Sequence, residues 1–232
     1  MMNTKLHYCS TSEFHNLSEA EALGRLKDRA ESNAAELVEK TIPPLYRHSD
    51  TGRLNQKMLA ACAAWKVSPV GLGLVGKTGI GKTRCVFHRL EQLIRNVEIE
   101  QSEPVGDKVE RGHVSSFFKI PRIEAVNDAV LAKLVLAALD FDDRTGASRR
   151  LKDFHCADVL FLDDVGQSKI SERTGAEIYE LVEYRTSNLK PIVFTSNFRG
   201  RQLAEKFTDT TRGDAVVRRL AEFCRIIVED AP

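Results

Sequence analysis

The hydrophobic positions follow two patterns along the chain: short runs that are apolar throughout, and longer stretches with apolar residues at helical spacing. The runs predict buried strands at residues 70–75, 159–162 and 191–195, with further strands at 114–120 and 224–228. The helical pattern predicts helices at residues 54–66, 82–95, 124–139, 172–188, 202–207 and 215–222. Strands that alternate with helices and are apolar on both faces indicate an α/β fold, with a parallel sheet flanked by helices.

One more helix is predicted near the start of the chain. Ser18 and Glu21 form an S-x-x-E capping box, and a modest apolar stripe follows until Pro43. This helix either packs on the core or serves as an arm for a partner. We expect residues 1–42 to form this N-terminal helical arm, ahead of one nucleotide-binding domain at residues 43–232.

The remaining stretches predict irregular structure. No periodicity is visible before Phe14, so we expect the first residues to be loosely ordered. Residues 98–112 are polar and contain Pro104, which predicts an exposed loop or a hairpin. The segment DFDDRTGASRR from Asp140 predicts a charged loop.

The composition argues against several classes of protein. Lysine and arginine number 34 against 33 acidic residues, so the net charge of +1 provides no general attraction to nucleic acid or to an anionic membrane. The five cysteines are scattered without a CxxC pair, which argues against a disulfide framework and a zinc site. No apolar stretch approaches the roughly 20 residues of a membrane span, and the N-terminus lacks the apolar core of a signal peptide. We therefore expect a cytoplasmic protein.

The most specific signal is GKTGIGKT, which comprises Gly76, Lys77, Thr78, Gly79, Ile80, Gly81, Lys82 and Thr83. It fits G-x-x-x-x-G-K-T in full and lies between a predicted strand and a predicted helix, which argues against a chance glycine turn. In such a loop, backbone N–H groups surround a β-phosphate and the helix start adds its positive end. Lys82 is expected to reach the β- and γ-phosphates of ATP, and the Thr83 hydroxyl to bind Mg²⁺.

A second glycine pattern overlaps this loop. The segment GLGLVG at residues 71–76 matches the G-x-G-x-x-G fingerprint of dinucleotide-binding domains. That fingerprint follows its strand and opens a helix, whereas Gly71 and Gly73 lie inside the predicted strand. We interpret the match as accidental, with the two glycines leaving space for a neighbouring element.

Acidic residues end the strand predicted at residues 159–162. In VLFLDD, Asp163 and Asp164 lie at the carboxyl end of a buried strand, where open α/β sheets bind ligands. Asp163 is the candidate for holding Mg²⁺ through a water, and Asp164 for orienting or activating the attacking water. A strand followed by a helix cap would give the same local pattern. The assignment therefore depends on the phosphate-binding loop, or P-loop, predicted upstream at residues 76–83.

Two further candidates come later in the chain. The strand in PIVFTSN ends in polar residues, and the Asn197 amide is a candidate for fixing the hydrolytic water beside the γ-phosphate. Arginines then occur among acidic residues, at Arg199, Arg201, Arg212, Arg218, Arg219 and Arg225. Most suit a solvated helix face, but one is a candidate arginine finger that reaches the ATP of a neighbouring subunit.

These motifs, in this order, resemble the AAA+ ATPases of the DnaC/IstB type, which include bacterial and phage helicase loaders and transposition helper ATPases. The resemblance extends from Ile42 to about Leu220, and its marks are IPPLYR, GLGLVGKTGIGKT, ADVLFLDDVG, SERTGAEIYELVEYR and FTSN. It implies a Walker A pair at Lys82 and Thr83, a Walker B pair at Asp163 and Asp164, and sensor 1 at Asn197.

The likeness also implies an arginine finger at Arg219, with Arg212 and Arg218 as substitutes. Two departures from the family pattern matter. Asp164 stands where many AAA+ proteins have Glu, which suggests slow hydrolysis. The short stretch after Arg219 implies that a C-terminal helical lid domain is absent, as is typical of this type.

By resemblance, the chain is a helicase loader in DNA replication that assembles on single-stranded DNA as an ATP-dependent homo-oligomer. Its N-terminal residues 17–40 would grip a hexameric replicative helicase. Hydrolysis of ATP would be stimulated by DNA or by the partner. The basic candidates for DNA contact are Lys119, Arg122, Arg144, Arg149 and Arg150, and such binding would weaken steeply with salt.

Three alternatives stay open. A transposition helper of the same fold would act with a transposase, and nothing in the sequence separates it from a helicase loader. A P-loop kinase for a small acceptor would want an arginine-rich lid, and it offers no reason for Asn197 at the end of its own strand. A non-hydrolysing nucleotide switch would bind ATP without releasing phosphate.

Overall fold

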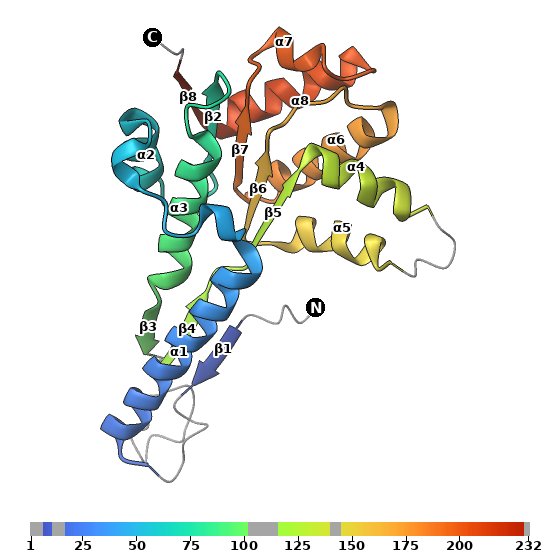
Figure 1. Ribbon diagram of the computed structural model, residues 1–232. Helices are drawn as coiled ribbons and strands as arrows, with labels where there is room; N and C mark the ends of the chain where they lie inside the picture. The colour runs from blue at the N-terminus through green and yellow to red at the C-terminus, as the bar shows by residue number, and fades with distance from the viewer. Residues whose placement is uncertain (1–6, 11–16, 102–115, 140–144, 230–232) are drawn as a thin grey trace. The chain divides into compact units, whose positions relative to one another are not determined.

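The computed structural model describes residues 7–10, 17–101, 116–139 and 145–229 (Figure 1). The chain divides into two compact units, which comprise Met1–Arg47 with Leu90–Arg122, and His48–Arg89 with Ile123–Pro232. This differs from the division we expected at residue 42, because residues 90–122 join the N-terminal residues. Among the described helices, none has both the length and the apolar character needed to cross a membrane.

The first unit is a small antiparallel sheet with one long helix. Its strand order is β1 (His7–Ser10), β4 (Ser116–Ile120), β3 (Glu98–Gln101). Helix α1 (Glu19–Thr41) begins with the predicted capping box, in which the Ser18 N–H donates to Glu21 Oε2 at 3.0 Å. The helix contacts β1 and β4, and its buried residues are Ala22, Leu26, Ala30, Ala34, Leu37 and Val38. Its apolar stripe therefore packs on a core, and a partner of α1 would meet the charged face.

Two segments pair with β4, and this bears on the predictions for the start of the chain and for residues 98–112. The start of the chain was expected to be loosely ordered, but His7–Ser10 forms a strand, with His7 opposite Ile120 and Ser10 opposite Phe117. This strand has no local pattern that predicts it, because it depends on pairing with a partner more than a hundred residues away. Glu98–Gln101 pairs antiparallel with β4, which confirms the hairpin alternative, whereas residues 102–115 lie outside the described residues.

The second unit contains the predicted parallel sheet. Its strand order is β5 (Ile123–Asn127), β6 (Val159–Asp163), β7 (Ile192–Ser196), β2 (Gly71–Gly76), β8 (Cys224–Glu229). Every neighbouring pair is parallel. The carboxyl ends of all five strands therefore lie at one edge of the sheet, where ligands of this architecture bind.

Helices cover both faces of this sheet (Figure 1). Leu160 and Leu162 of β6 lie in one buried cluster with side chains of α4, α6 and α8. Phe161, between them, packs edge-on against Phe87 of α3, with ring centroids 5.1 Å apart. Successive strand residues point to opposite faces, so α3 covers the face opposite α4, α6 and α8. The helices are α2 (Gln56–Ala64), α3 (Lys82–Arg95), α4 (Asp128–Ala137), α5 (Ala147–Cys156), α6 (Glu172–Ser187), α7 (Arg201–Ala204) and α8 (Thr210–Phe223), with 3₁₀ turns at Pro44–Tyr46 and Thr51–Arg53.

The single helix predicted at residues 124–139 is wrong in its first part. Ile123–Asn127 forms strand β5, and helix α4 starts at Asp128. Ile123 and Val126, the two buried residues of the strand, are spaced as on a helix face, so the local pattern suits both structures and pairing with β6 selects the strand. Asn127 then caps α4 by accepting a hydrogen bond from the Val130 N–H at 2.8 Å.

The charged loop predicted from Asp140 is also corrected. Residues 140–144 lie outside the described residues, but Ala147–Cys156 forms helix α5. Only Ala147 and Phe154 of this helix are buried, and its remaining positions are mostly polar. With so few buried positions, the helical spacing of apolar residues is hard to detect in the sequence.

The glycines inside β2 do leave space for a neighbouring element. A Cβ on Gly71 would lie 2.1 Å from the Ile192 carbonyl oxygen of β7, and one on Gly73 would lie 2.5 Å from the Phe194 ring. The helix that follows β2 begins only at Lys82. Both facts support the interpretation of the G-x-G-x-x-G match as accidental.

Candidate functional site

The P-loop connects the end of β2 to the start of α3. Gly79 and Gly81 both have φ of +88°, a left-handed conformation that glycine adopts without steric cost. Helix α3 follows at once, with the Cys85 N–H bonded to the Gly81 carbonyl at 2.9 Å. The loop therefore combines backbone N–H groups with a helix N-terminus, a combination that attracts phosphate.

Lys82 lies at the centre of the site and is almost fully buried. Its ammonium donates to the carbonyl oxygens of Gly76 (2.8 Å) and Lys77 (2.9 Å), and to Asn197 Oδ1 (2.7 Å). Burial lowers the pKa of Lys82, and the nearby carboxylates of Asp163 and Asp164 partly oppose this effect. An ammonium has three donors, so each of them is satisfied here.

Thr83 joins the P-loop to β6. Its hydroxyl donates to Asp163 Oδ1 at 2.8 Å. The same carboxylate oxygen accepts a hydrogen bond from Thr195 Oγ1 of β7 at 2.6 Å. Burial raises the pKa of Asp163, while these two hydroxyl donors lower it. The predicted Thr83 and Asp163 pair thus forms a partly buried oxygen site, although the two residues are far apart in the sequence.

This pair suits a magnesium ion. Mg²⁺ binds to proteins through one or two oxygen side chains and takes its other ligands from phosphates and water. A hydroxyl and a carboxylate in contact at the edge of a phosphate-binding loop match that requirement, and a cation would offset the cost of burying Asp163. Within the described residues there is no group of three or more His, Cys, Asp or Glu side chains that would form a metal site of another type.

Asp164 adopts an uncommon backbone conformation. Its φ is +53°, which Asp tolerates better than most residues, and its N–H donates to Thr195 Oγ1 at 2.8 Å. Within the described part of the chain, its carboxylate accepts no hydrogen bond and is partly exposed. It lies close enough to Lys82 and Asp163 for their charges to interact.

Asn197 follows β7 and completes the arrangement. Its Oδ1 accepts from Lys82, and its Nδ2 donates to Gln167 Oε1 at 2.6 Å. The structure therefore brings together the P-loop, Asp163, Asp164 and Asn197, as the sequence predicted. Thr195 and Gln167 were missed as individual residues, although both occur within or beside the quoted motifs.

Part of the chain resembles a known protein family. Residues 126–230, less than half of the chain, match the family model described as IstB-like ATP binding protein. This segment contains Asp163, Asp164 and Asn197 but not the P-loop. No curated protein sequence matches the chain.

Several solved structures have a fold similar to that of this chain. The DnaC helicase loader is 20% identical with a TM-score of 0.54, covering 80% of this chain and 99% of the other. A putative primosome component from Streptococcus pyogenes serotype M3 is 17% identical with a TM-score of 0.55, covering 84% and 95%. The replication initiator DnaA bound to AMPPCP and single-stranded DNA is 16% identical with a TM-score of 0.52, covering 82% and 51%. The chain therefore shares its fold with these three proteins.

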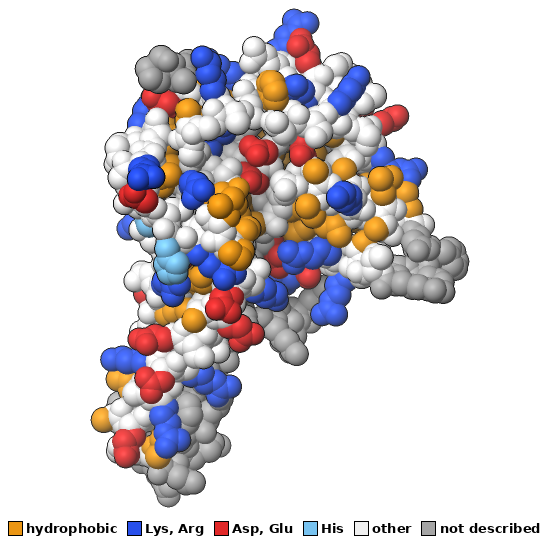
Figure 2. Space-filling view, in the orientation of Figure 1, with side chains coloured by type: hydrophobic (Ala, Val, Ile, Leu, Met, Phe, Trp, Pro, Cys, Tyr) orange, Lys and Arg blue, Asp and Glu red, His pale blue; other side chains and the backbone are white. Residues whose placement is uncertain are grey.

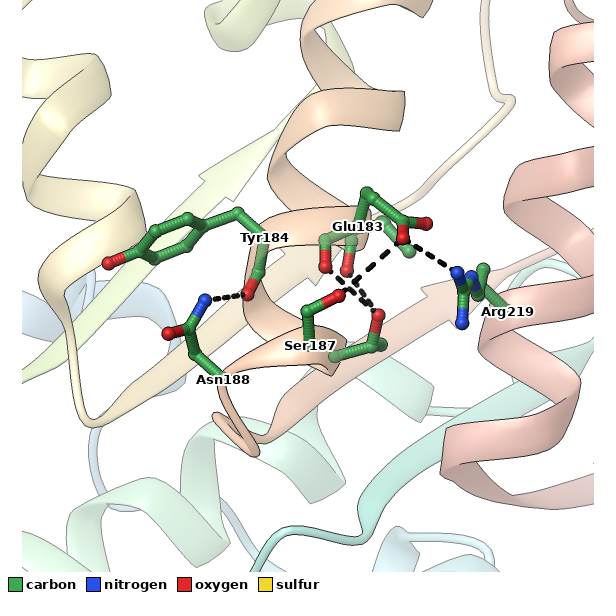
Figure 3. Close-up of polar contacts among 7 residues, drawn as sticks. Glu183, Tyr184, Ser187, Asn188 and Arg219 are labelled. Atoms are coloured by element: carbon green, nitrogen blue, oxygen red, sulfur yellow. Dashed lines mark hydrogen bonds and ion pairs between the residues drawn. The ribbon is translucent and has the colours of Figure 1, made fainter.

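The candidate arginine finger, Arg219, lies on α8 and contacts α6. The Arg219 Nη2 pairs with Glu183 Oε1 of α6 at 2.6 Å, and its Cζ lies 5.8 Å from the centre of the Phe223 ring. Figure 3 shows Arg219 and Glu183 pointing toward one another, with Ser187 beside Glu183. Of the two substitutes, Arg212 bonds to the Glu172 carbonyl and pairs with Asp209, whereas Arg218 is exposed.

The residues predicted to contact DNA are distributed over both units. Lys119 is exposed on β4, and Arg122 ends the first unit. Arg149 is exposed on α5, whereas Arg150 pairs with Glu124 at 2.6 Å and lies over the Phe154 ring. Arg144 lies outside the described residues. Basic and acidic side chains are interspersed over the face in Figure 2, in keeping with the near-neutral charge.

Proposed function

We propose that the site binds Mg-ATP and hydrolyses it. The observation that carries this proposal is the convergence of Lys82, Thr83, Asp163 and Asn197 from the ends of three parallel strands, with a 2.7 Å contact between Lys82 Nζ and Asn197 Oδ1 and a 2.8 Å contact between Thr83 Oγ1 and Asp163 Oδ1. A P-loop nest, a buried cation and a hydroxyl–carboxylate pair at one sheet edge suit a nucleoside triphosphate and its metal.

Each side chain has a role that follows from its position. Lys82 exchanges its present acceptors for β- and γ-phosphate oxygens, which compensate its buried charge better than carbonyl groups do. Thr83 and Asp163 hold Mg²⁺, which neutralises phosphate charge when it is bound. The carboxylate of Asp164 accepts a hydrogen bond from the attacking water, and Asn197 helps to position that water.

Phosphate release measured with and without single-stranded DNA tests this proposal. Lys82→Ala should lower turnover by at least about 100-fold, because it removes a charge contact to the transferring group. Lys66→Ala is the matched control, since Lys66 is an exposed lysine whose side chain makes no hydrogen bond or ion pair with the described residues. If Lys82→Ala released phosphate as fast as the parent, the site assignment would be wrong. Binding of ATP without any release would instead favour the nucleotide switch.

We further propose that the protein is a helicase loader that assembles on single-stranded DNA and delivers a hexameric replicative helicase. Support comes from the DnaC helicase loader and the putative primosome component, which share its fold and are nearly fully covered by it. The charged face of α1 is the proposed helicase contact, because its apolar face is already packed.

A transposition helper is the second candidate, and one finding favours it: the matching family model is described as IstB-like ATP binding protein. The two candidates are separated by pull-downs with the whole chain, using a replicative helicase and a transposase as alternative partners. The whole chain is needed because residues 90–122 belong to the same unit as α1. Capture of the transposase alone would reject the loader. A kinase is disfavoured by the contact of Asn197 with Lys82, and ATP turnover without an acceptor would argue against it.

In the assembled state, we propose that Arg219 of one protomer reaches the ATP of the next. Leaving Glu183 costs only about 0.2–1 kcal/mol, because water reaches both partners, whose side chains are 30% and 34% exposed. Arg219→Ala should therefore bind ATP normally and lose turnover. Mixing Arg219→Ala with Lys82→Ala should restore part of the activity, because intact sites of the first variant then meet intact arginines of the second. Unchanged turnover of Arg219→Ala would assign the finger elsewhere, with the exposed Arg218 next in line.

A further inference from the structure

The loop that follows Asp164 is held rigidly against the end of β7. The Asp164 N–H donates to Thr195 Oγ1 (2.8 Å), and the Val165 N–H donates to the Thr195 carbonyl (2.9 Å). Ser196 Oγ, fully buried, donates to the Val165 carbonyl at 2.7 Å. The Gln167 N–H closes a turn onto the Asp164 carbonyl at 3.0 Å. The position of the Gln167 backbone is therefore determined by the same strand that carries Asn197.

A buried carboxylate fixes the far side of this loop. Asp128, the first residue of α4, is 8% exposed, and its Oδ2 accepts from the Ser168 N–H at 3.1 Å. Burial raises the pKa of Asp128, and backbone hydrogen bonds, including one with Gln167, lower it. The nucleotide chemistry proposed above gives Asp128 no role, so its burial is explained by anchoring residues 167 and 168.

The side chain of Gln167 meets Asn197, and the chemistry of Lys82 determines which way the two amides face. A lysine ammonium only donates, so the Asn197 atom that faces it, at 2.7 Å, is the oxygen Oδ1. The amide nitrogen Nδ2 then faces Gln167 and needs an acceptor, which Gln167 Oε1 provides at 2.6 Å. The three residues form one chain of hydrogen bonds with a single polarity.

We propose that Gln167 is a positioning residue for ATP hydrolysis: it keeps the Asn197 oxygen facing the P-loop when Lys82 turns to phosphate. Gln167 is exposed, so water would replace its oxygen as the acceptor of Asn197 Nδ2 in a variant. A water is not fixed in position, so the Asn197 amide could then rotate by half a turn and present Nδ2 instead of Oδ1. When Oδ1 faces the P-loop, it can accept a hydrogen bond from the attacking water, whereas Nδ2 in the same position can only donate one. This proposal rests on the hydrolysis proposed above and adds to it a residue that acts through Asn197.

The test is single-turnover phosphate release together with ATP affinity for the full chain. Gln167→Met, similar in length but without a hydrogen bond, should lower the rate roughly 2- to 10-fold, the range of a single neutral hydrogen bond, with ATP affinity unchanged. Gln167→Glu keeps an acceptor and should retain most of the rate. Gln202→Met is the matched control, since Gln202 is exposed on α7 and its side chain makes no hydrogen bond with described residues.

A double-mutant cycle shows whether Gln167 acts through Asn197. In the Asn197→Ala background, Gln167→Met should change the rate by less than about 2-fold, because the group that it orients is gone. The proposal is overturned if Gln167→Met matches the parent, if it weakens ATP binding instead of turnover, if Gln167→Glu is as slow as Gln167→Met, or if the loss persists in the Asn197→Ala background. In each of these cases the parent protein still hydrolyses ATP. If the proposed function itself were wrong, the parent protein would release no phosphate.

Discussion

Replacing the buried Arg185 with methionine should destabilise the second unit by about 2–4 kcal/mol. Arg185 lies on α6 with no exposed surface. Its Nη1 donates to the carbonyl oxygens of Phe154 (2.8 Å) and Ala157 (3.0 Å), and its Nη2 donates to that of Pro191 (2.7 Å). One side chain thus ties α6 to the end of α5 and to the residue before β7.

The magnitude follows from the hydrogen bonds that methionine would remove. A buried carbonyl left without any donor costs about 1–3 kcal/mol, so three such groups would represent about 3–9 kcal/mol. The loss is smaller here, because the Pro191 carbonyl also accepts from the Leu160 N–H at 3.4 Å and the Ala157 carbonyl from Lys190 Nζ at 3.5 Å. It is further offset because burial penalises the charged guanidinium, lowering the pKa of Arg185 to about 10, and because its Nε has no hydrogen-bond partner among the described residues. Methionine also fills a similar apolar volume.

Thermal or urea unfolding followed by circular dichroism measures the effect. For a chain of this size, a loss of about 2–4 kcal/mol lowers the unfolding temperature by about 5–15 °C. Arg173→Met is the control, because Arg173 is exposed on the same helix and its side chain makes no hydrogen bond or ion pair with described residues. If the two variants unfolded at the same temperature, the carbonyl contacts of Arg185 would contribute nothing to stability, and the reasoning would be refuted.

Three further predictions use other buried groups. Thr195→Val keeps the shape of the side chain but removes its hydrogen bonds to Asp163 and Asp164. Turnover in a phosphate-release assay should fall about 5- to 100-fold, the range for a loss of about 1–3 kcal/mol. Normal turnover would show that these hydrogen bonds do not contribute to catalysis. Gly73→Ala should lower the free energy of unfolding by about 1–3 kcal/mol in urea melts, because its Cβ meets the Phe194 ring, and an unchanged midpoint would show that the ring moves freely. Burial raises the pKa values of three thiols, to about 12 for Cys62, about 11 for Cys85 and about 12 for Cys224. Iodoacetamide should therefore react slowly with these thiols in the folded protein up to pH 9, and rapidly once urea unfolds it. Fast labelling of the folded protein, measured by mass spectrometry, would show that the thiols are accessible.

The sequence by itself determined the features that are encoded within a short stretch of chain. The P-loop is contiguous from Gly76 to Thr83, and glycine spacing together with a strand before it and a helix after it identifies it. Fully apolar runs ending in Asp163 or near Asn197 identify buried strands and the edge at which they end. Parallel strands end at the same edge, so the predicted meeting of these residues followed from the sequence and one rule of topology.

The tertiary structure decided whatever depends on a partner that is distant in the sequence. The segment at Ile123–Asn127 suits a helix or a strand until it pairs with β6, and His7–Ser10 becomes a strand only beside β4. The contacts of Thr195 with Asp163, and of Gln167 with Asn197, join residues about thirty positions apart that have no local pattern. Periodicity reports which side of an element is buried, because that depends on neighbours within a few residues. It does not report which side chains meet there, because that depends on strand order and on how the loops are packed.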